Sequence, residues 1–378
     1  MLRQHRDQMV LRSGGREERV VGRVRRRRDG MQRRPGAAVE LAERALVRRR
    51  GAADGELGRH SATLAPVSHP RPQDSPMRIA VTGSNGLIGS ALVSSLRRDG
   101  HQVVRLVRHE PRAADEVVWD PKGGTVDTRG LAGCAAVVHL AGAGVGDRRW
   151  TRAYKRELRD SRVLGTATIA EAVAGMPEPP GTLLVGTAIG WYGDTGDRPV
   201  DESEPPGRGF MAQLCTEWEA AAAPAERAGV RTVFARTGLV VSRQGGAWGR
   251  LFPVFRAGIG GRLGSGRQYW SHIALQDHIA ALRHVLDTPA LRGPVNLTAP
   301  EPVTNREVTA AMARVLHRPA LFPVPTPVLR VVLGEFAEDV VGSQRVRPTR
   351  LLESGFRFAF PDVEDAIRAA LDRPEPRP

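Results

Sequence analysis

The chain has 378 residues, a formal net charge of +15, 41% hydrophobic residues and two cysteines. This length allows one large α/β domain, or a nucleotide-binding domain with a smaller partner. The absence of a run of about 18 apolar residues argues against a membrane span. Two cysteines argue against a disulfide framework and a four-ligand zinc site, so we expect no metal and a reducing, cytoplasmic location.

Residues 1–76 form an Arg-rich leader that contains 18 arginines and nine acidic residues and carries most of the excess positive charge. Its basic runs repel themselves and apolar residues are sparse, so we expect disorder rather than a domain. The segment 39–50 could form a short basic amphipathic helix, for which a solvated tail is a better interpretation than contact with nucleic acid or a membrane. A third possibility, which we favour, is that the true start is Met77.

From Met77 onward, strand and helix patterns alternate along the chain, which predicts a doubly wound parallel α/β sheet over residues 77–240. A looser pattern over residues 241–378 predicts a smaller lobe that completes a cleft. In chain order, the expected strands are Arg78–Thr82, Gln102–Val107, Val117–Trp119, Ala135–Leu140, Thr182–Val185 and Arg231–Ala235. The expected helices are Leu87–Arg98, Tyr154–Ala174, Phe210–Ala228 with a kink at Pro224, Gln276–Leu286, Asn305–Leu316, Pro327–Val332 and Val363–Leu371.

A glycine-rich turn joins the first strand to the first helix. Gly83 permits a tight turn, Gly86 lets backbone N–H groups approach a pyrophosphate, and Gly89 lets the helix pack closely on the strand. The helix N-terminus then presents free N–H groups and a positive dipole end to the anion. This context predicts a Rossmann-type dinucleotide site. The residues of the loop are Gly83, Ser84, Asn85, Gly86, Leu87, Ile88 and Gly89.

The end of the second strand selects between nicotinamide cofactors. An acidic residue there would bind the ribose 2′-hydroxyl of NAD. The strand instead ends at Arg108, whose guanidinium suits the 2′-phosphate of NADP(H). Arg105 is an alternative, Glu110 leaves NAD(H) open as the less favoured cofactor, and an exposed surface role for Arg108 is the competing interpretation.

Several further stretches resemble the extended short-chain dehydrogenases/reductases, and more narrowly the atypical "epimerase family" proteins that carry a C-terminal domain of unknown function. The resemblance covers Met77 to about Leu371. It implies a Rossmann-type domain, a small substrate lobe and an NADP cofactor. It also implies that Leu140, Ala141 and Gly142 line the cofactor cleft and that Asp120 lies beside the adenine. The stretches are His139–Gly142, Arg149–Thr151, Arg159–Arg162, Gly190–Gly193, Leu214–Glu219, Arg236–Gly238, Gly264–Gln268 and Gly342–Val346.

The catalytic Tyr-x-x-x-Lys of that family is missing. Alignment through Trp218-Glu219 puts Met211 at the Tyr position and Cys215 at the Lys position, and neither side chain can replace its counterpart. Cys215 is interpreted as a small buried apolar residue, with a thiol acid/base as the alternative.

Thr187 and Tyr192 are the candidate catalytic residues that remain. Thr187 ends a strand where the hydroxyl donor belongs, although a β-branched residue there also simply closes a strand. Tyr192 is the best candidate for proton transfer, although packing of the loop is the commoner role for such a residue.

A candidate substrate segment lies in the second half of the chain. Arg267 and Gln268 could bind a polar or anionic substrate, and a surface turn explains them equally well. The family's His-x-Asp-Asp is not complete here, and His272 is a candidate to compensate.

Two functions follow from these residues. The first is an NADP-dependent oxidoreductase or epimerase acting on a small polar substrate that the sequence does not name. The second is a non-catalytic NADPH-binding regulatory or scaffold protein, which the missing Tyr and Lys favour. The sequence does not fix the oligomeric state, and we do not expect nucleic acid or a membrane as a partner.

Overall fold

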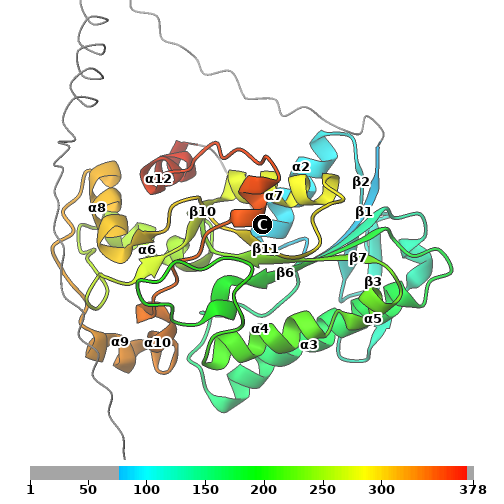
Figure 1. Ribbon diagram of the computed structural model, residues 1–378, viewed down its shortest axis with the longest axis horizontal. Coiled ribbons are helices and arrows are strands. Elements are labelled where there is room, and N and C mark those ends of the chain that lie inside the picture. Colours follow the sequence, from blue (N-terminus) through cyan, green and yellow to red (C-terminus); the bar gives the residue numbers. More distant parts are fainter. Residues whose placement is uncertain (1–75, 373–378) are drawn as a thin grey trace, which may run out of the picture. The chain divides into compact units, whose positions relative to one another are not determined.

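An eight-stranded sheet forms the centre of residues 76–372, the part of the chain that the computed structural model describes (Figure 1). The strands lie in the order β11-β7-β6-β5-β1-β2-β3-β4. Seven are parallel, and β4 runs antiparallel to β3. In chain order they are β1 (Arg78–Thr82), β2 (Gln102–Val107), β3 (Glu116–Asp120), β4 (Thr125–Val126), β5 (Ala136–His139), β6 (Thr182–Ala188), β7 (Arg231–Thr237) and β11 (Gly293–Leu297).

The strand order reverses between β1 and β5. The chain runs outward from β1 to β2 and β3, and then returns to build β5, β6 and β7 on the other side of β1. This is the doubly wound arrangement, so the predicted fold class is confirmed. Ligands of such sheets bind beyond the carboxyl ends of the strands, at the point of reversal.

Helices cover both faces of the sheet (Figure 1). The helices α3 (Arg152–Ala174), α4 (Phe210–Ala220) and α5 (Ala223–Arg227) lie on one face, and α2 (Leu87–Arg98) and α7 (Leu275–Asp287) lie on the other. Alternate residues of each strand feed the two cores, as the period of a strand requires: Leu183 and Val185 belong to the core under α3, whereas Leu184 belongs to the core under α2.

A third apolar core lies among the elements that follow β7, and it is centred on Trp248 and Phe252. The strands of this region are β8 (Leu239–Val241), β9 (Tyr269–Trp270), β10 (His272–Ala274) and β12 (Val303–Thr304). Its helices are α6 (Gly246–Arg256), α8 (Asn305–Leu316), α9 (Thr326–Leu333), α10 (Phe336–Val341), α11 (Thr349–Glu353) and α12 (Val363–Asp372).

Two features of the chain differ from the sequence-based expectation. The expected single helix Phe210–Ala228 is divided into α4 and α5, because Pro224 has no backbone N–H and is accommodated in the first turn of a new helix. In addition, β11 joins the main sheet beside β7, although it comes from the range expected to form the smaller lobe. The boundary at residue 240 stays a prediction.

The Arg-rich leader lies outside the described residues, so the expectations for it stay predictions. Within residues 76–372, no helix is both long enough and apolar enough to span a membrane.

Candidate functional site

The loop after β1 is closed tightly against β5. Gly83 has a φ of +64°, and a Cβ atom there would lie 2.8 Å from the backbone carbonyl of Leu140. A Cβ atom on Gly89 would lie 2.1 Å from the carbonyl oxygen of Gly83. Glycine is therefore required at both positions, as the sequence predicts.

The N-terminus of α2 has the geometry of an anion site. Gly86 occupies the N-cap position without a side-chain hydrogen bond, and the first turn contains no acidic residue. The N–H groups at the start of a helix have no intrahelical partner, so those of Leu87 and Ile88 are available to a ligand. Asn85 and Gly86 are exposed, whereas Ser84 is buried beneath the loop. These residues fit the pyrophosphate of a dinucleotide.

Thr82 ties the glycine loop to the end of β5. Its hydroxyl oxygen accepts hydrogen bonds from the backbone N–H groups of Leu140 (3.0 Å) and Ala141 (3.1 Å). Both lone pairs are then used, so the hydroxyl donates its own proton to Nδ1 of His139, 2.8 Å away. His139 is fully buried, and burial lowers its pKa to about 4. The imidazole is therefore neutral at physiological pH.

The structure distinguishes Arg105 from Arg108, the two arginines that the sequence offers for a 2′-phosphate at the carboxyl end of β2. Arg105 is held by two carboxylates, with Nε 2.8 Å from Asp115 and Nη2 3.0 Å from Glu116. Arg108 is exposed, and its side chain has no ion pair within residues 76–372. Glu110 is also exposed. Between the two arginines, the structure thus selects Arg108 as the group that a phosphate could reach.

Asp120 is the last residue of β3 and is exposed. Its Oδ1 accepts a hydrogen bond from the backbone N–H of Lys122 at 2.9 Å, and hydrogen bonds from Gly123 and Lys122 lower the pKa of this carboxyl. The side chain therefore shapes the turn between β3 and β4, and its position beside an adenine stays a prediction.

The segment after β5 is fixed by side chains of α3. The N–H of Ala143 donates to Oγ of Ser161 at 3.1 Å, and the carbonyl of Ala143 accepts from Nη2 of Arg162 at 2.9 Å. Gly142, beside this residue, is exposed. Leu140, Ala141 and Gly142 therefore have defined positions next to the glycine loop, and their place in a cofactor cleft stays a prediction.

The candidate catalytic residues Thr187 and Tyr192 lie in one buried polar network. Arg236 forms a bidentate pair with Glu219, with both N–O distances 2.8 Å. Thr187 donates to Oε1 of Glu219 at 3.2 Å. Tyr192 donates to Oδ1 of Asn296 at 2.8 Å and accepts from Nη1 of Arg236 at 3.1 Å.

This network does not favour the proton-transfer role suggested for Tyr192, which stays a prediction. Its hydroxyl is already both donor and acceptor, the residue is 4% exposed, and burial raises its pKa to about 12. The hydroxyl of Thr187 donates a hydrogen bond to the carboxylate of Glu219 on α4. Both side chains act as structural parts of the Arg236–Glu219 pair in this geometry.

Met211 and Cys215, which the sequence alignment puts at the Tyr and Lys positions of the family, pack around Gly190. Both lie on α4, and a Cβ atom on Gly190 would be 3.1 Å from Cβ of Met211 and 3.7 Å from Sγ of Cys215. The Cys215 thiol donates to the carbonyl of Ala188 at 3.6 Å, and burial raises its pKa to about 12. Cys215 is thus the buried apolar residue that the sequence favoured.

The two predicted substrate residues differ in their exposure to solvent. Gln268 is 6% exposed and its Nε2 donates to the carbonyl of Leu263 at 2.9 Å, so the amide fastens a turn and its role toward a substrate stays a prediction. Arg267 is exposed beside it. His272 is fully buried in β10, and burial lowers its pKa to about 4, so it does not replace the family's missing histidine at a surface.

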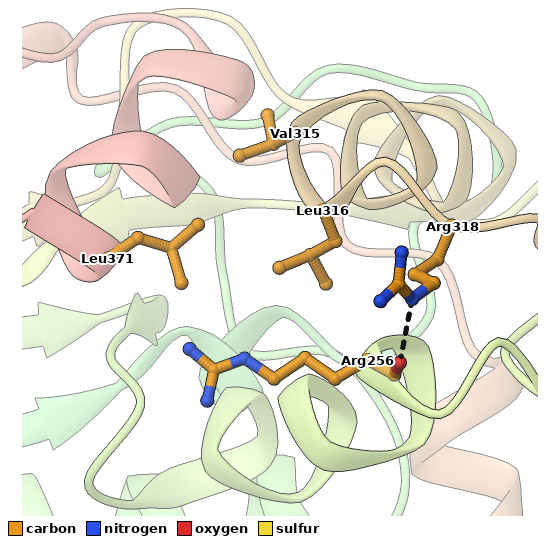
Figure 2. Close-up of a pocket in the computed structure, with 5 residues that line it drawn as sticks. All are labelled: Arg256, Val315, Leu316, Arg318 and Leu371. Atoms are coloured by element: carbon orange, nitrogen blue, oxygen red, sulfur yellow. Dashed lines mark hydrogen bonds between the residues drawn. The ribbon is translucent and has the colours of Figure 1, made fainter.

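A hollow of about 470 Å³ opens among α6, α8 and α12 (Figure 2). It combines two guanidinium groups with three aliphatic side chains, and Nε of Arg318 donates to the carbonyl of Arg256 at 3.2 Å. No predicted site residue lines it. Its lining residues are Arg256, Val315, Leu316, Arg318 and Leu371.

Sequence reasoning gave no role to Glu219, Arg236 or Arg162. All three lie in stretches that carried the family resemblance. A charged residue that directly follows the apolar run of a central strand, such as Arg236 after Val233–Ala235 in β7, is the signal that could have revealed a buried pair. Its partner could not be identified, because the two residues meet only in the folded chain.

Comparisons with known proteins agree with this geometry. Residues 79–297 match the NAD dependent epimerase/dehydratase family, and residues 324–370 match a domain of unknown function, DUF1731. An epimerase family protein of Mycobacterium bovis is 45% identical over 297 residues, which cover 78% of this chain and 98% of the relative.

Two solved structures are similar over 79% of this chain. The human epimerase family protein SDR39U1 with NADPH has a TM-score of 0.72 and 32% identity, and all of that chain is covered. A nucleoside-diphosphate sugar epimerase from Corynebacterium glutamicum has a TM-score of 0.66 and 34% identity, and 59% of that chain is covered.

Proposed function

The chain belongs to the NAD-dependent epimerase/dehydratase family, and we propose that it binds NADP(H) through its glycine loop and Arg108. The observation that carries this proposal is the arginine at the end of β2: Arg108 is exposed and without an ion pair in the described part of the chain, while Arg105 is held by Asp115 and Glu116. A free guanidinium at this place suits a 2′-phosphate.

The glycine loop supports the same proposal. The uncapped start of α2 would hold the pyrophosphate, and the segment Leu140–Gly142 would line the cleft beside it. The human relative was solved with NADPH, whereas several more distant structures of the same fold were solved with NAD. The NADPH-bound relative supports NADP(H) as the proposed cofactor, with NAD(H) as the less favoured alternative.

We propose a non-catalytic regulatory or scaffold role for the bound cofactor. Bound NADPH carries a transferable hydride, but the candidate proton donors within residues 76–372 are engaged: Thr187 and Tyr192 belong to the Arg236–Glu219 network, and Met211 and Cys215 occupy the Tyr and Lys positions. Two buried cysteines, both free thiols, support the expected cytoplasmic location.

The rival function is an oxidoreductase or epimerase that acts on a small polar substrate. The family membership favours it, as does the description of the Corynebacterium glutamicum relative as a nucleoside-diphosphate sugar epimerase. In that case exposed Arg267 is the residue left to bind an anionic substrate.

Calorimetric titration of the full chain with NADPH and NADH tests the cofactor proposal. We expect tighter binding of NADPH, and Arg108→Ala should weaken it by about 10- to 100-fold while leaving NADH unchanged, since a hydrogen bond to a charged group contributes about 1.5–3 kcal/mol. Arg112→Ala, an exposed arginine of the same loop, is the matched control. Equal weakening of both cofactors, or no binding of either, contradicts the proposal.

The non-catalytic role is tested separately in two assays. NADPH absorbance is followed with a panel of carbonyl compounds, and nucleoside-diphosphate sugars incubated with the chain and NADP⁺ are separated by chromatography, because an epimerase returns the hydride and leaves the cofactor unchanged overall. We expect no turnover by the wild-type chain under conditions that saturate it with the cofactor. Turnover of any of these compounds would establish the rival function, and its loss in Tyr192→Phe, with cofactor binding retained, would assign a part in it to Tyr192.

A further inference from the structure

A buried arginine without a carboxylate partner lies beneath the segment that follows β5. Arg162, on α3, is 7% exposed. Its guanidinium donates to the carbonyls of Leu158 at 3.1 Å and Ala143 at 2.9 Å, and its Cζ lies 4.9 Å from the Trp218 ring centre. Within residues 76–372 it forms no ion pair. Burying a charge without a counter-ion lowers the stability of the fold, so the buried position of Arg162 indicates a function for its charge.

The guanidinium of Arg162 lies directly beside Gly142, the last residue of the segment Leu140–Gly142. A Cβ atom on Gly142 would lie 3.5 Å from Cζ of Arg162, and Gly142 itself is exposed. The same charge acts on Cys215, where it opposes the rise in the thiol pKa that burial causes. A cation from α3 therefore acts on Cys215, the residue that the sequence alignment puts at the Lys position of the family.

The surrounding acidic groups do not neutralise Arg162. The buried carboxylate of Glu219 is already bound by Arg236. Asp147 and Glu157 are about half exposed or more, and they pair with Arg250 and Arg148 respectively. Because exposed charges are screened by water and buried ones are not, the potential beneath Gly142 is positive.

The strand order indicates which half of a bound dinucleotide meets this charge, an argument that depends on the function proposed above. A dinucleotide spans the reversal between β1 and β5. Arg108 lies at the end of β2, so the half with the 2′-phosphate takes the side of β2 and β3. The nicotinamide half is then left for the side of β5 and β6, where Gly142 and Arg162 lie.

We propose that Arg162 makes the site selective for the redox state of the cofactor, so that the chain binds NADPH more tightly than NADP⁺. The nicotinamide ring of NADP⁺ carries a positive charge and that of NADPH is neutral, so a buried cation repels only the oxidised form. A tenfold difference in affinity corresponds to about 1.4 kcal/mol, which lies within the range that Coulomb's law gives for two unit charges in a protein at an effective dielectric constant of about 20. The occupied fraction of the protein then follows the ratio of NADPH to NADP⁺, as a regulatory role requires.

Titration of the full chain with NADPH and with NADP⁺ tests this inference through the ratio of their dissociation constants. For the wild-type chain we expect NADP⁺ to bind about tenfold more weakly. Arg162→Met removes the charge but keeps the aliphatic stem, and should bring the ratio close to one. Arg162→Lys keeps the charge and should keep the ratio. Arg156→Met, an exposed arginine on the same helix, should change nothing.

The ratio separates an electrostatic role from a structural one. If Arg162 only positions Ala143, both Arg162 variants weaken NADPH and NADP⁺ equally and the inference is overturned. A wild-type chain that binds both forms equally overturns it without any variant, even if Arg162→Met does not fold. A wild-type chain that binds neither form refutes the cofactor proposal itself. An Arg162→Met variant that binds NADPH and keeps the wild-type ratio of dissociation constants refutes only the inference.

Discussion

Glu219→Gln is expected to destabilise the fold strongly, because Glu219 neutralises the buried Arg236. The side chains are 3% (Arg236) and 8% (Glu219) exposed, they meet through two contacts of 2.8 Å, and the guanidinium stacks on Trp191 with Cζ 3.8 Å from the ring centre. Glutamine removes the counter-charge and turns an N–H group toward the guanidinium. Breaking a buried pair in this way costs about 3–5 kcal/mol.

Urea unfolding followed by circular dichroism measures this loss directly, and a fall in Tm of about 10 °C should accompany it. Glu171→Gln, on an exposed position of α3, is the matched control and should change the stability little. A double variant, Glu219→Met with Arg236→Met, should recover part of the loss, because an apolar pair of similar volume needs no counter-charge. A loss below about 1 kcal/mol in Glu219→Gln, or a double variant less stable than the single one, would refute this account of the network.

Two further outcomes are expected. Gly89→Ala should abolish NADPH binding, because its Cβ would lie 2.1 Å from the Gly83 carbonyl oxygen, whereas Gly181→Ala, with 3.7 Å to its nearest neighbour, should bind normally in the same titration. Stability should also fall as the pH drops from about 6.5 to 4. In this range His139 becomes protonated in the unfolded chain but stays neutral in the folded one, where burial lowers its pKa to about 4, and the resulting loss of stability from this group is about 3 kcal/mol. His139→Asn should flatten that part of the urea-midpoint profile, and parallel profiles for the two proteins would contradict the assignment.

The cofactor half of the site was accessible from the sequence because its determinants are local. Gly83, Gly86 and Gly89 lie within one turn between a strand and a helix, and the constraints on such a turn depend on neighbouring residues alone. The alternation of strand and helix patterns similarly predicted the doubly wound sheet, since each pattern has its own period. The missing Tyr and Lys were also visible, as a comparison of positions needs no geometry.

Pairings between distant residues were decided only by the tertiary structure. The choice between Arg105 and Arg108 depended on Asp115 and Glu116, which the pairing of β2 with β3 brings to Arg105. The hydroxyl of Tyr192 looked available until β11 placed Asn296 beside it, 104 residues along the chain. Hydrophobic periodicity specifies which face of an element is buried, but it does not specify the partner of a buried polar group, because that partner is fixed by the packing of the whole chain.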